Sequence, residues 1–216
     1  MYASVYQNGE IRNGYEDLRP YLPRRRKRRQ YKGFRQAQKL WRPVLPSIEN
    51  RPKEILKRRT IGDWEDDTMV SRESLGRFKT VNERRSGVVF IGKMKDGSME
   101  ESNRVVLKRL GEVPSTYRRT LTRDRGTENF GYVEIEKELT MSCFFAHAYC
   151  SHERGSNENT NGLIRRYFPK GTDLAIVTDE EVARVEYLLN TRPRKRLGGL
   201  TPYEVFYQET GVALKC

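Results

Sequence analysis

The chain has 216 residues, of which 36% are hydrophobic, so it can form one sizeable domain with an appendage. This length excludes a peptide hormone and a large multidomain machine, and its three cysteines are too few for a disulfide scaffold. The net charge of +13 lies at the front, because residues 1–60 hold 17 basic and only 5 acidic side chains.

Residues 1–58 are predicted to form an extended basic arm. Five prolines between residues 20 and 52 interrupt any long helix there. The centre of the arm is a run of six basic residues, a density that suits a phosphate backbone. We predict that this run binds a polyanion, and the alternative is a solvated linker with no dedicated partner. The start of the chain has no secretion signal and no apolar run approaches roughly 20 residues, so we expect a cytoplasmic protein outside the membrane.

Regular structure is predicted over residues 59–216. Strand patterns over 61–70, 79–83 and 87–93 form an antiparallel meander with a turn at 84–86. A helix over 99–110, a strand over 119–124, a helix over 132–139 and a strand over 141–146 follow. Helices over 156–168, 179–190 and 202–208 complete the domain. This order predicts an α/β fold with a mixed sheet flanked by helices.

Acidic residues alternate along the first predicted strand. Asp63, Glu65 and Asp67 fall on one face, while Trp64, expected to pack in the core, and Asp66 fall on the other. Three acids on one face repel one another and need partners if they are buried, and a divalent cation would meet that need. Because Mg²⁺ usually takes one or two carboxylates from any one element, we expect further ligands from other elements.

Two later acids are candidates for those ligands. Asp124 ends the strand over 119–124, and the glycine two residues later permits a tight turn at the rim of the sheet. Glu158 opens the helix over 156–168, for which Ser156 is the predicted N-cap, and Leu163, Ile164 and Tyr167 are expected to face the core. Each acid alone has an ordinary structural role, in a turn or at a helix dipole. Two aspartates on strands and a glutamate on a helix can together converge on a pair of metal ions that promote phosphodiester displacement.

Several segments of the chain resemble a known family. They are GDWEDDT at 62–68, TRDRGTE at 122–128 and ERGSNENTNGLIR at 153–165, continued by YFPKGTD at 167–173, NTRPRKRLG at 190–198 and TPYEVF at 201–206. Over about residues 59–208 the chain resembles the DDE transposases of the insertion sequence thirty family. The resemblance implies a ribonuclease H-like integrase catalytic core in which Asp67, Asp124 and Glu158 are the catalytic triad and the metal ligands. Asp66 stands where many relatives have glycine.

The resemblance also implies an activity, cofactors and partners. The activity is DNA cleavage at the ends of an insertion sequence followed by strand transfer, with a pair of Mg²⁺ or Mn²⁺ ions. The partners are the element ends, the target DNA and further copies of the chain on DNA, in association with the nucleoid. DNA contacts are assigned to the basic run and to arginines and a lysine near the later motifs: Arg24, Arg25, Arg26, Lys27, Arg28, Arg29, Arg154, Arg165, Arg192, Arg194, Lys195 and Arg196.

The sequence departs from the family at its front. Relatives usually carry a helix-turn-helix region that recognises the terminal inverted repeats, and we expect only a remnant of it before the basic arm. Three hypotheses therefore stay open. The chain is a DDE transposase catalytic domain, a truncated and catalytically silent DNA-binding remnant of a transposase, or a metal-dependent nuclease of the same fold without a strand-transfer step.

Overall fold

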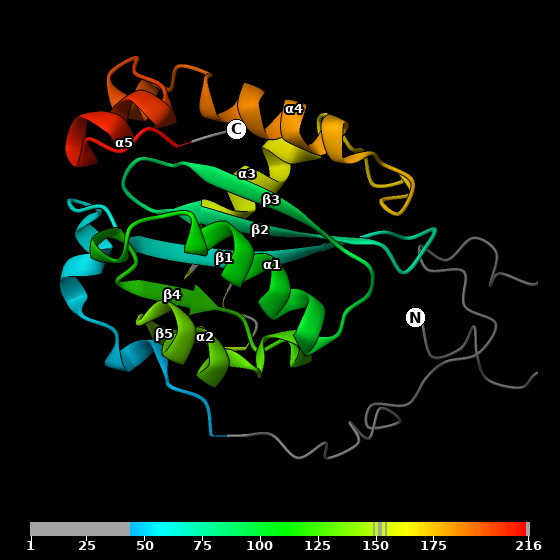
Figure 1. The fold of residues 1–216 in the computed structure, drawn as a ribbon, viewed down its shortest axis with the longest axis horizontal. Coiled ribbons are helices and arrows are strands. Elements are labelled where there is room, and N and C mark those ends of the chain that lie inside the picture. Colours follow the sequence, from blue (N-terminus) through cyan, green and yellow to red (C-terminus); the bar gives the residue numbers. More distant parts are fainter. Residues whose placement is uncertain (1–43, 149, 151–152, 154, 215–216) are drawn as a thin grey trace, which may run out of the picture. The chain divides into compact units, whose positions relative to one another are not determined.

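The computed structural model describes residues 44–148, 150, 153 and 155–214 (Figure 1). The basic run at residues 24–29 and Arg154 lie outside these residues. No helix in the described part of the chain is long and apolar enough to cross a membrane.

Five strands form one mixed sheet in the order β3-β2-β1-β4-β5. They are β1 (Asp63–Val70), β2 (Arg77–Glu83), β3 (Val89–Met94), β4 (Thr120–Arg123) and β5 (Ser142–Phe145). The predicted meander is confirmed, because β2 pairs antiparallel with both β1 and β3. β4 lies parallel to β1 and β5 lies parallel to β4, which makes the sheet mixed.

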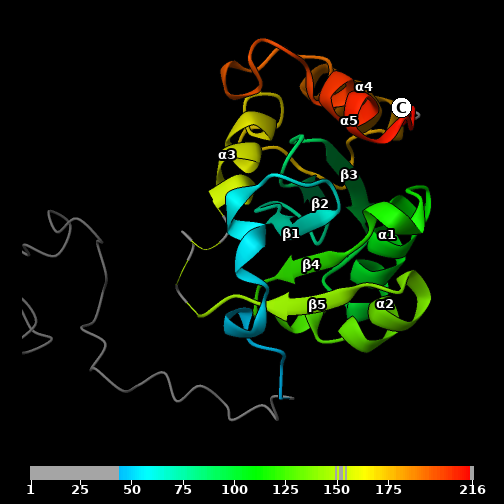
Figure 2. The ribbon, with the colours of Figure 1, turned by 90° about the vertical axis from the view of Figure 1, so that its left-hand side faces the viewer.

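The described residues also form five α-helices, which cover the sheet. They are α1 (Met99–Gly111), α2 (Tyr132–Leu139), α3 (Gly155–Ile164), α4 (Asp179–Asn190) and α5 (Pro202–Thr210). Figure 2 shows α1 and α2 on one side of the sheet and α3 on the other. Capping boxes start α4 at Thr178 and α5 at Thr201, which explains why both helices begin where the sequence predicts.

The predicted helix over 156–168 is too long and begins too late. In the structure α3 starts at Gly155, so Ser156 lies inside the helix instead of capping it. The helix ends at Ile164, where the N–H of Tyr167 donates to the carbonyl of Ile164 at 3.0 Å and tightens the last turn. Pro169 disfavours helical backbone at the residue before it, so the chain leaves the helix here.

Two apolar clusters hold the layers together. The first contains Trp64, which is fully buried as predicted and stacks on Phe90 with ring centroids 5.5 Å apart. The second lies on the α3 and α4 side and includes Met69, Phe78 and Ile164. Trp64 and Met69 therefore point to opposite faces of β1, as strand alternation requires.

The segment before β1 packs against the sheet. It contains two short 3₁₀ helices, η3 (Ile48–Asn50) and η4 (Lys53–Lys57). The N–H of Phe145 in β5 donates to the carbonyl of Pro46 at 2.8 Å, and Ile55 is buried. The sequence assigns residues 44–58 to the basic arm; in the structure they belong to one compact unit that begins at Val44.

The opposite edge of the sheet is covered by α4. The side chain of Asn190 accepts a hydrogen bond from the N–H of Val89 at 2.9 Å and donates one to the Val89 carbonyl at 2.7 Å. Glu186 accepts from the N–H of Ile91 at 2.6 Å. Two side chains of α4 thus satisfy backbone groups that the edge strand β3 would otherwise leave unpaired.

Glu83 at the end of β2 predicts a pH dependence of stability. Its carboxyl accepts hydrogen bonds from Gly62 N–H at 3.2 Å and from Ser86 N–H at 2.6 Å, and burial raises its pKa to about 7. Above the ordinary pKa of glutamate the unfolded chain has released this proton, whereas the folded state keeps it up to about pH 7. The free energy of unfolding therefore falls as the pH rises towards 7. We expect the parent chain to lose on the order of 3 kcal/mol of its free energy of unfolding between pH 4.5 and 7, and Glu83→Gln to abolish this loss. Urea unfolding at pH 5 and pH 7.5 tests this, and a variant with the same pH dependence as the parent would contradict it.

Candidate active site

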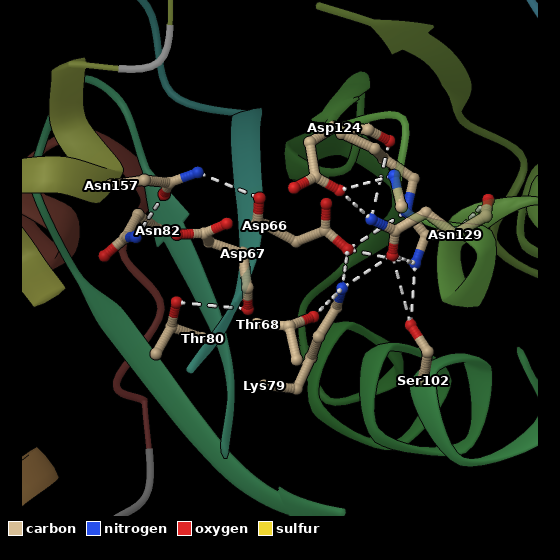
Figure 3. A network of polar contacts seen from close by, with 12 residues as sticks. Asp66, Asp67, Thr68, Lys79, Thr80, Asn82, Ser102, Asp124, Asn129 and Asn157 are labelled. Carbon is tan, nitrogen blue, oxygen red and sulfur yellow. Dashed lines mark hydrogen bonds and ion pairs between the residues drawn. The ribbon is translucent and has the colours of Figure 1, made fainter. Parts of the chain in front are cut away.

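Asp67 lies in the middle of β1 on the face covered by α3. Its side chain is half-buried and accepts a hydrogen bond from the amide nitrogen of Asn161 in α3. Asp66 points to the other side of β1, as Figure 3 shows. The predicted separation of these two neighbouring acids onto opposite faces is therefore correct.

The other two acids on the Asp67 face have cationic partners. Asp63 accepts from Arg119 Nη2 at 2.7 Å and from Thr120 Oγ1 at 2.9 Å. Glu65 forms a buried ion pair with Arg84. Arginines thus balance two of the three acids, so the repulsion that we expected a divalent cation to relieve is already relieved at Asp63 and Glu65.

Asp124 directly follows β4, the strand that pairs with β1. In the β1–β4 register Asp63 pairs with Thr120 and Glu65 with Thr122. Asp67 and Asp124 each lie two residues beyond the last of these pairs, Asp67 within β1 and Asp124 just past the end of β4. Asp124 Oδ1 accepts from the N–H of Gly126 at 3.1 Å, which is the predicted tight turn.

A buried cluster of charges lies behind Asp124 (Figure 3). Asp66 pairs with Lys79 at 2.8 Å and with Arg123 at 3.0 Å, and all three side chains are fully buried. Burial alone would raise the pKa of Asp66, but Arg123 and Lys79 outweigh it and hold that pKa below its ordinary value. The cluster therefore keeps Asp66 ionised inside the protein.

Asn129 connects this cluster to Asp124. Its side-chain oxygen accepts from Lys79 at 2.7 Å and from Arg123 at 2.9 Å. Its amide nitrogen is thereby turned towards Asp124 and donates to Oδ1 of that carboxylate. Sequence reasoning missed Asn129. The available signal was Lys79 and Arg123, two basic residues at positions where strand alternation predicts burial and where hydrogen-bond acceptors such as Asn129 are therefore needed.

Two asparagines attach α3 to the sheet. The amide nitrogen of Asn157 donates to the carbonyl of Asp66 at 2.9 Å, and its oxygen accepts from Asn82 at 2.6 Å. The side-chain oxygen of Asn161 accepts from Thr80 at 3.3 Å, so its nitrogen is directed to Asp67. These contacts fix α3 against β1 and β2.

The predicted inner face of this helix is partly wrong. Ile164 is fully buried as expected and Leu163 is partly buried, but Tyr167 lies beyond the helix and is 41% exposed. Asn157 and Asn161 take the sheet-facing positions instead, because the strand carbonyl and carboxylate beneath them need hydrogen-bond donors.

Glu158 is exposed, next to the sheet-facing side of α3. It lines a shallow surface hollow with Asn159, Gly162 and Arg166. Within the described residues, no three side chains of His, Cys, Asp or Glu form a group that could hold a metal ion. The structure thus places Asp67 on β1 and Asp124 directly after the neighbouring strand β4, and it docks the helix of Glu158 over the sheet. Among the described residues the three carboxylates do not form one group that could hold a metal ion.

The candidate DNA-binding residues in the described region lie on two segments. Arg165 donates to the carbonyl of Val70 at 3.0 Å, at the end of β1. In the loop after α4, Arg192 and Lys195 are exposed, while Arg194 donates to the Leu189 carbonyl at 3.0 Å. Burial and the neighbouring Arg196 and Arg192 lower the pKa of Arg194 to about 10.

Comparison with known proteins identifies the family. No family model matches the chain. It is 37% identical over 191 residues to the transposase for insertion sequence element IS4351 of Bacteroides fragilis, an alignment covering 88% of this chain and 58% of that protein. It is 38% identical over 167 residues to transposase InsI for element IS30A of Escherichia coli strain K12, covering 77% of this chain and 43% of that protein. The chain belongs to the IS30 family of transposases. It spans about half the length of these IS30-family relatives.

Solved structures support the fold. The catalytic core domain of BIV integrase has a TM-score of 0.54 at 16% identity and covers 68% of this chain and 93% of that core. A chain of a simian T-cell lymphotropic virus intasome, in complex with a PP2A regulatory subunit, has a TM-score of 0.57 at 15% identity. The match covers 82% of this chain and 59% of the intasome chain. The IS30-family chain therefore has the expected ribonuclease H-like α/β fold.

Proposed function

We propose that this chain is the catalytic domain of a DDE transposase, which cleaves DNA at the ends of an insertion sequence and transfers the freed strand to a target. The observation that supports the proposal is the parallel pairing of β1, which carries Asp67, with β4, which Asp124 directly follows, together with the docking of the helix of Glu158 on β1. The names of the relatives support the same reaction class.

The donor set suits a divalent cation with a preference for oxygen. Asp67, Asp124 and Glu158 offer carboxylate oxygens, which Mg²⁺ and Mn²⁺ favour. When bound, a pair of such ions would activate the attacking hydroxyl and stabilise the leaving oxygen of the phosphodiester. Asn161 and Asn129 each donate to one of the two aspartates and so orient their carboxylates.

The remaining residues would bind the nucleic acid. Arg165 lies beside the end of β1 and could steady a substrate phosphate, as could Arg154. The basic run Arg24–Arg29 and the loop residues Arg192, Arg194, Lys195 and Arg196 would follow the DNA backbone. We also propose that copies of the chain assemble on the element ends and target, in the cytoplasm at the nucleoid.

The test is a nicking and joining assay on supercoiled DNA with the purified chain in Mg²⁺ or Mn²⁺, beside a Glu158→Gln variant. We expect metal-dependent nicked and joined products that the variant loses. Nicks without joined products would identify a nuclease without strand transfer. DNA binding without any product would contradict the proposed activity and identify a silent DNA-binding protein.

A further inference from the structure

Three segments far apart in the sequence bring arginines together near the start of β1. Arg58 ends η4, Arg84 and Arg85 form the turn between β2 and β3, and Arg196 lies in η8 (Lys195–Leu197) after α4. Arg84 is buried, and the arginines of these segments that reach the surface form what we call the arginine track: Arg58, Arg85, Arg194 and Arg196.

Arg196 is held in place on the β2–β3 turn. Its Nη1 donates to the carbonyl of Arg85 at 2.9 Å. A Cβ added at Gly87 would lie 2.1 Å from its Nη2, so the absence of a side chain there makes room for the guanidinium. Gly87 also has a φ of +78°, which favours glycine independently. The β2–β3 turn thus contains Arg84 and Arg85 and also holds Arg196, which comes from another segment, in place.

The β2–β3 turn lies beside the start of β1, because the N–H of Arg84 donates to the carbonyl of Asp63 at 2.9 Å. Burial lowers the pKa of Arg84 to about 10, with further lowering by Arg51 and Arg58. The pKa of Arg196 is likewise lowered, first by burial and then by Arg58. The repulsion by Arg58 in both cases agrees with its position in the chain, five residues before Asp63.

The acids around the track balance only part of this charge. Arg84 is paired with buried Glu65, but Arg85 pairs with Glu209 at 2.7 Å, where the two side chains are 36% and 29% exposed. Pairs at this exposure contribute at most about 1 kcal/mol and exchange readily for another anion. Glu83 lies close by, yet its pKa of about 7 leaves it only partly ionised at neutral pH.

The backbone of Arg58 is in an unfavourable conformation. Its φ and ψ of 48° and 45° lie in the left-handed region, which it shares with Thr140 among the described residues other than glycine. A residue with a side chain loses roughly 1–2 kcal/mol there, and glycine would avoid most of that cost. Arg58 thus presents its charge at a position where a side chain lowers local stability.

We propose that the arginine track binds the phosphate backbone of duplex DNA beside the active site; this inference rests on the proposed function. Asp63, where β1 begins, is four residues from Asp67, or about 13 Å along the strand. That spacing corresponds to about four base pairs of duplex. The track would therefore hold the DNA that flanks the reacting phosphate on one side.

The experiment measures binding of the 216-residue chain, carrying Glu158→Gln to prevent cleavage, to a 30-base-pair duplex over a range of salt concentrations. Arg58→Gln, Arg85→Gln and Arg196→Gln are compared with Lys108→Gln, which removes an exposed charge from α1 on the other side of the sheet. For the triple track variant we expect at least a tenfold weaker affinity and a salt slope lower by up to about 0.9 for each phosphate that is no longer neutralised. Binding by the basic run is common to all variants and cancels in the comparison.

Arg58→Gly separates charge from folding. It should raise the midpoint of unfolding, because the strain is relieved, and still weaken DNA binding as Arg58→Gln does. Track variants that bind like Lys108→Gln would overturn the inference. Tighter binding of single-stranded RNA than of duplex DNA, abolished in the same variants, would also overturn it. If the parent chain nicks DNA but the track variants bind DNA normally, only the inference about the track is wrong. If the parent chain never nicks DNA, only the proposed function is wrong.

Discussion

Asp124→Asn is expected to lower the rate of DNA nicking at least about a thousandfold, and Asp67→Asn should do the same. The substitution keeps the shape of the side chain and removes the negative charge that a divalent cation requires. Loss of a metal-ion contribution of several kcal/mol corresponds to about three decades or more in rate. The measurement is single-turnover nicking of labelled duplex in Mg²⁺ and Mn²⁺, with DNA binding followed in parallel.

Asp63→Asn provides the matched control for these variants. Asp63 lies on the same strand and the same face as Asp67, but it is paired with Arg119 and Thr120. We expect its nicking rate to stay within tenfold of the parent once the folded fraction is taken into account. Nicking within tenfold of the parent in Asp67→Asn or Asp124→Asn would reject the assignment of these carboxylates.

Asp66→Asn is expected to destabilise the fold by roughly 3–5 kcal/mol, the cost of leaving buried charge without its partner. The amide keeps the volume, but Lys79 and Arg123 would then share a fully buried site without their anion. Urea unfolding at pH 7 measures the loss. Asp66→Asn combined with Lys79→Met should recover much of it, because one of the two uncompensated cations is removed.

The same residue predicts a loss of stability in acid. The pKa of Asp66 in the folded state lies below its ordinary value, so its contribution is complete above about pH 4 and is lost as the pH falls through the folded value. The Asp66→Asn and Lys79→Met double variant should lack this decline in unfolding experiments between pH 5 and pH 2. A single Asp66→Asn variant within 1 kcal/mol of the parent would show that the cluster does not depend on this anion.

Most of the fold follows from local sequence signals. Alternation along residues 61–70 correctly separates Trp64 from Met69 and Asp66 from Asp67, because the side chains of a strand point to opposite faces wherever it is placed. Capping residues such as Thr178 and Thr201 correctly start α4 and α5. These signals depend on neighbours in the chain and need no knowledge of distant contacts.

The site is less predictable because its polar side chains find their partners across the fold. Apolar periodicity assigned Tyr167 to the core and gave no weight to Asn157, since it cannot represent a buried carbonyl that needs a donor. The pairing of Asp63 with Arg119 joins residues 56 positions apart, so repulsion among the acids of β1 looked unrelieved from the strand alone. Asn129 likewise becomes significant only when Lys79 and Asp124 are brought together.

The covered edges of the sheet limit how copies of this chain can associate. Asn190 and Glu186 occupy the hydrogen-bonding groups of β3, and Ser47 bridges to Phe145 at the β5 edge. A second copy therefore cannot extend the sheet across either boundary without first displacing these contacts. Copies that keep these contacts would associate on DNA through other surfaces or through the nucleic acid itself, and each could then dissociate without breaking a shared β-ladder.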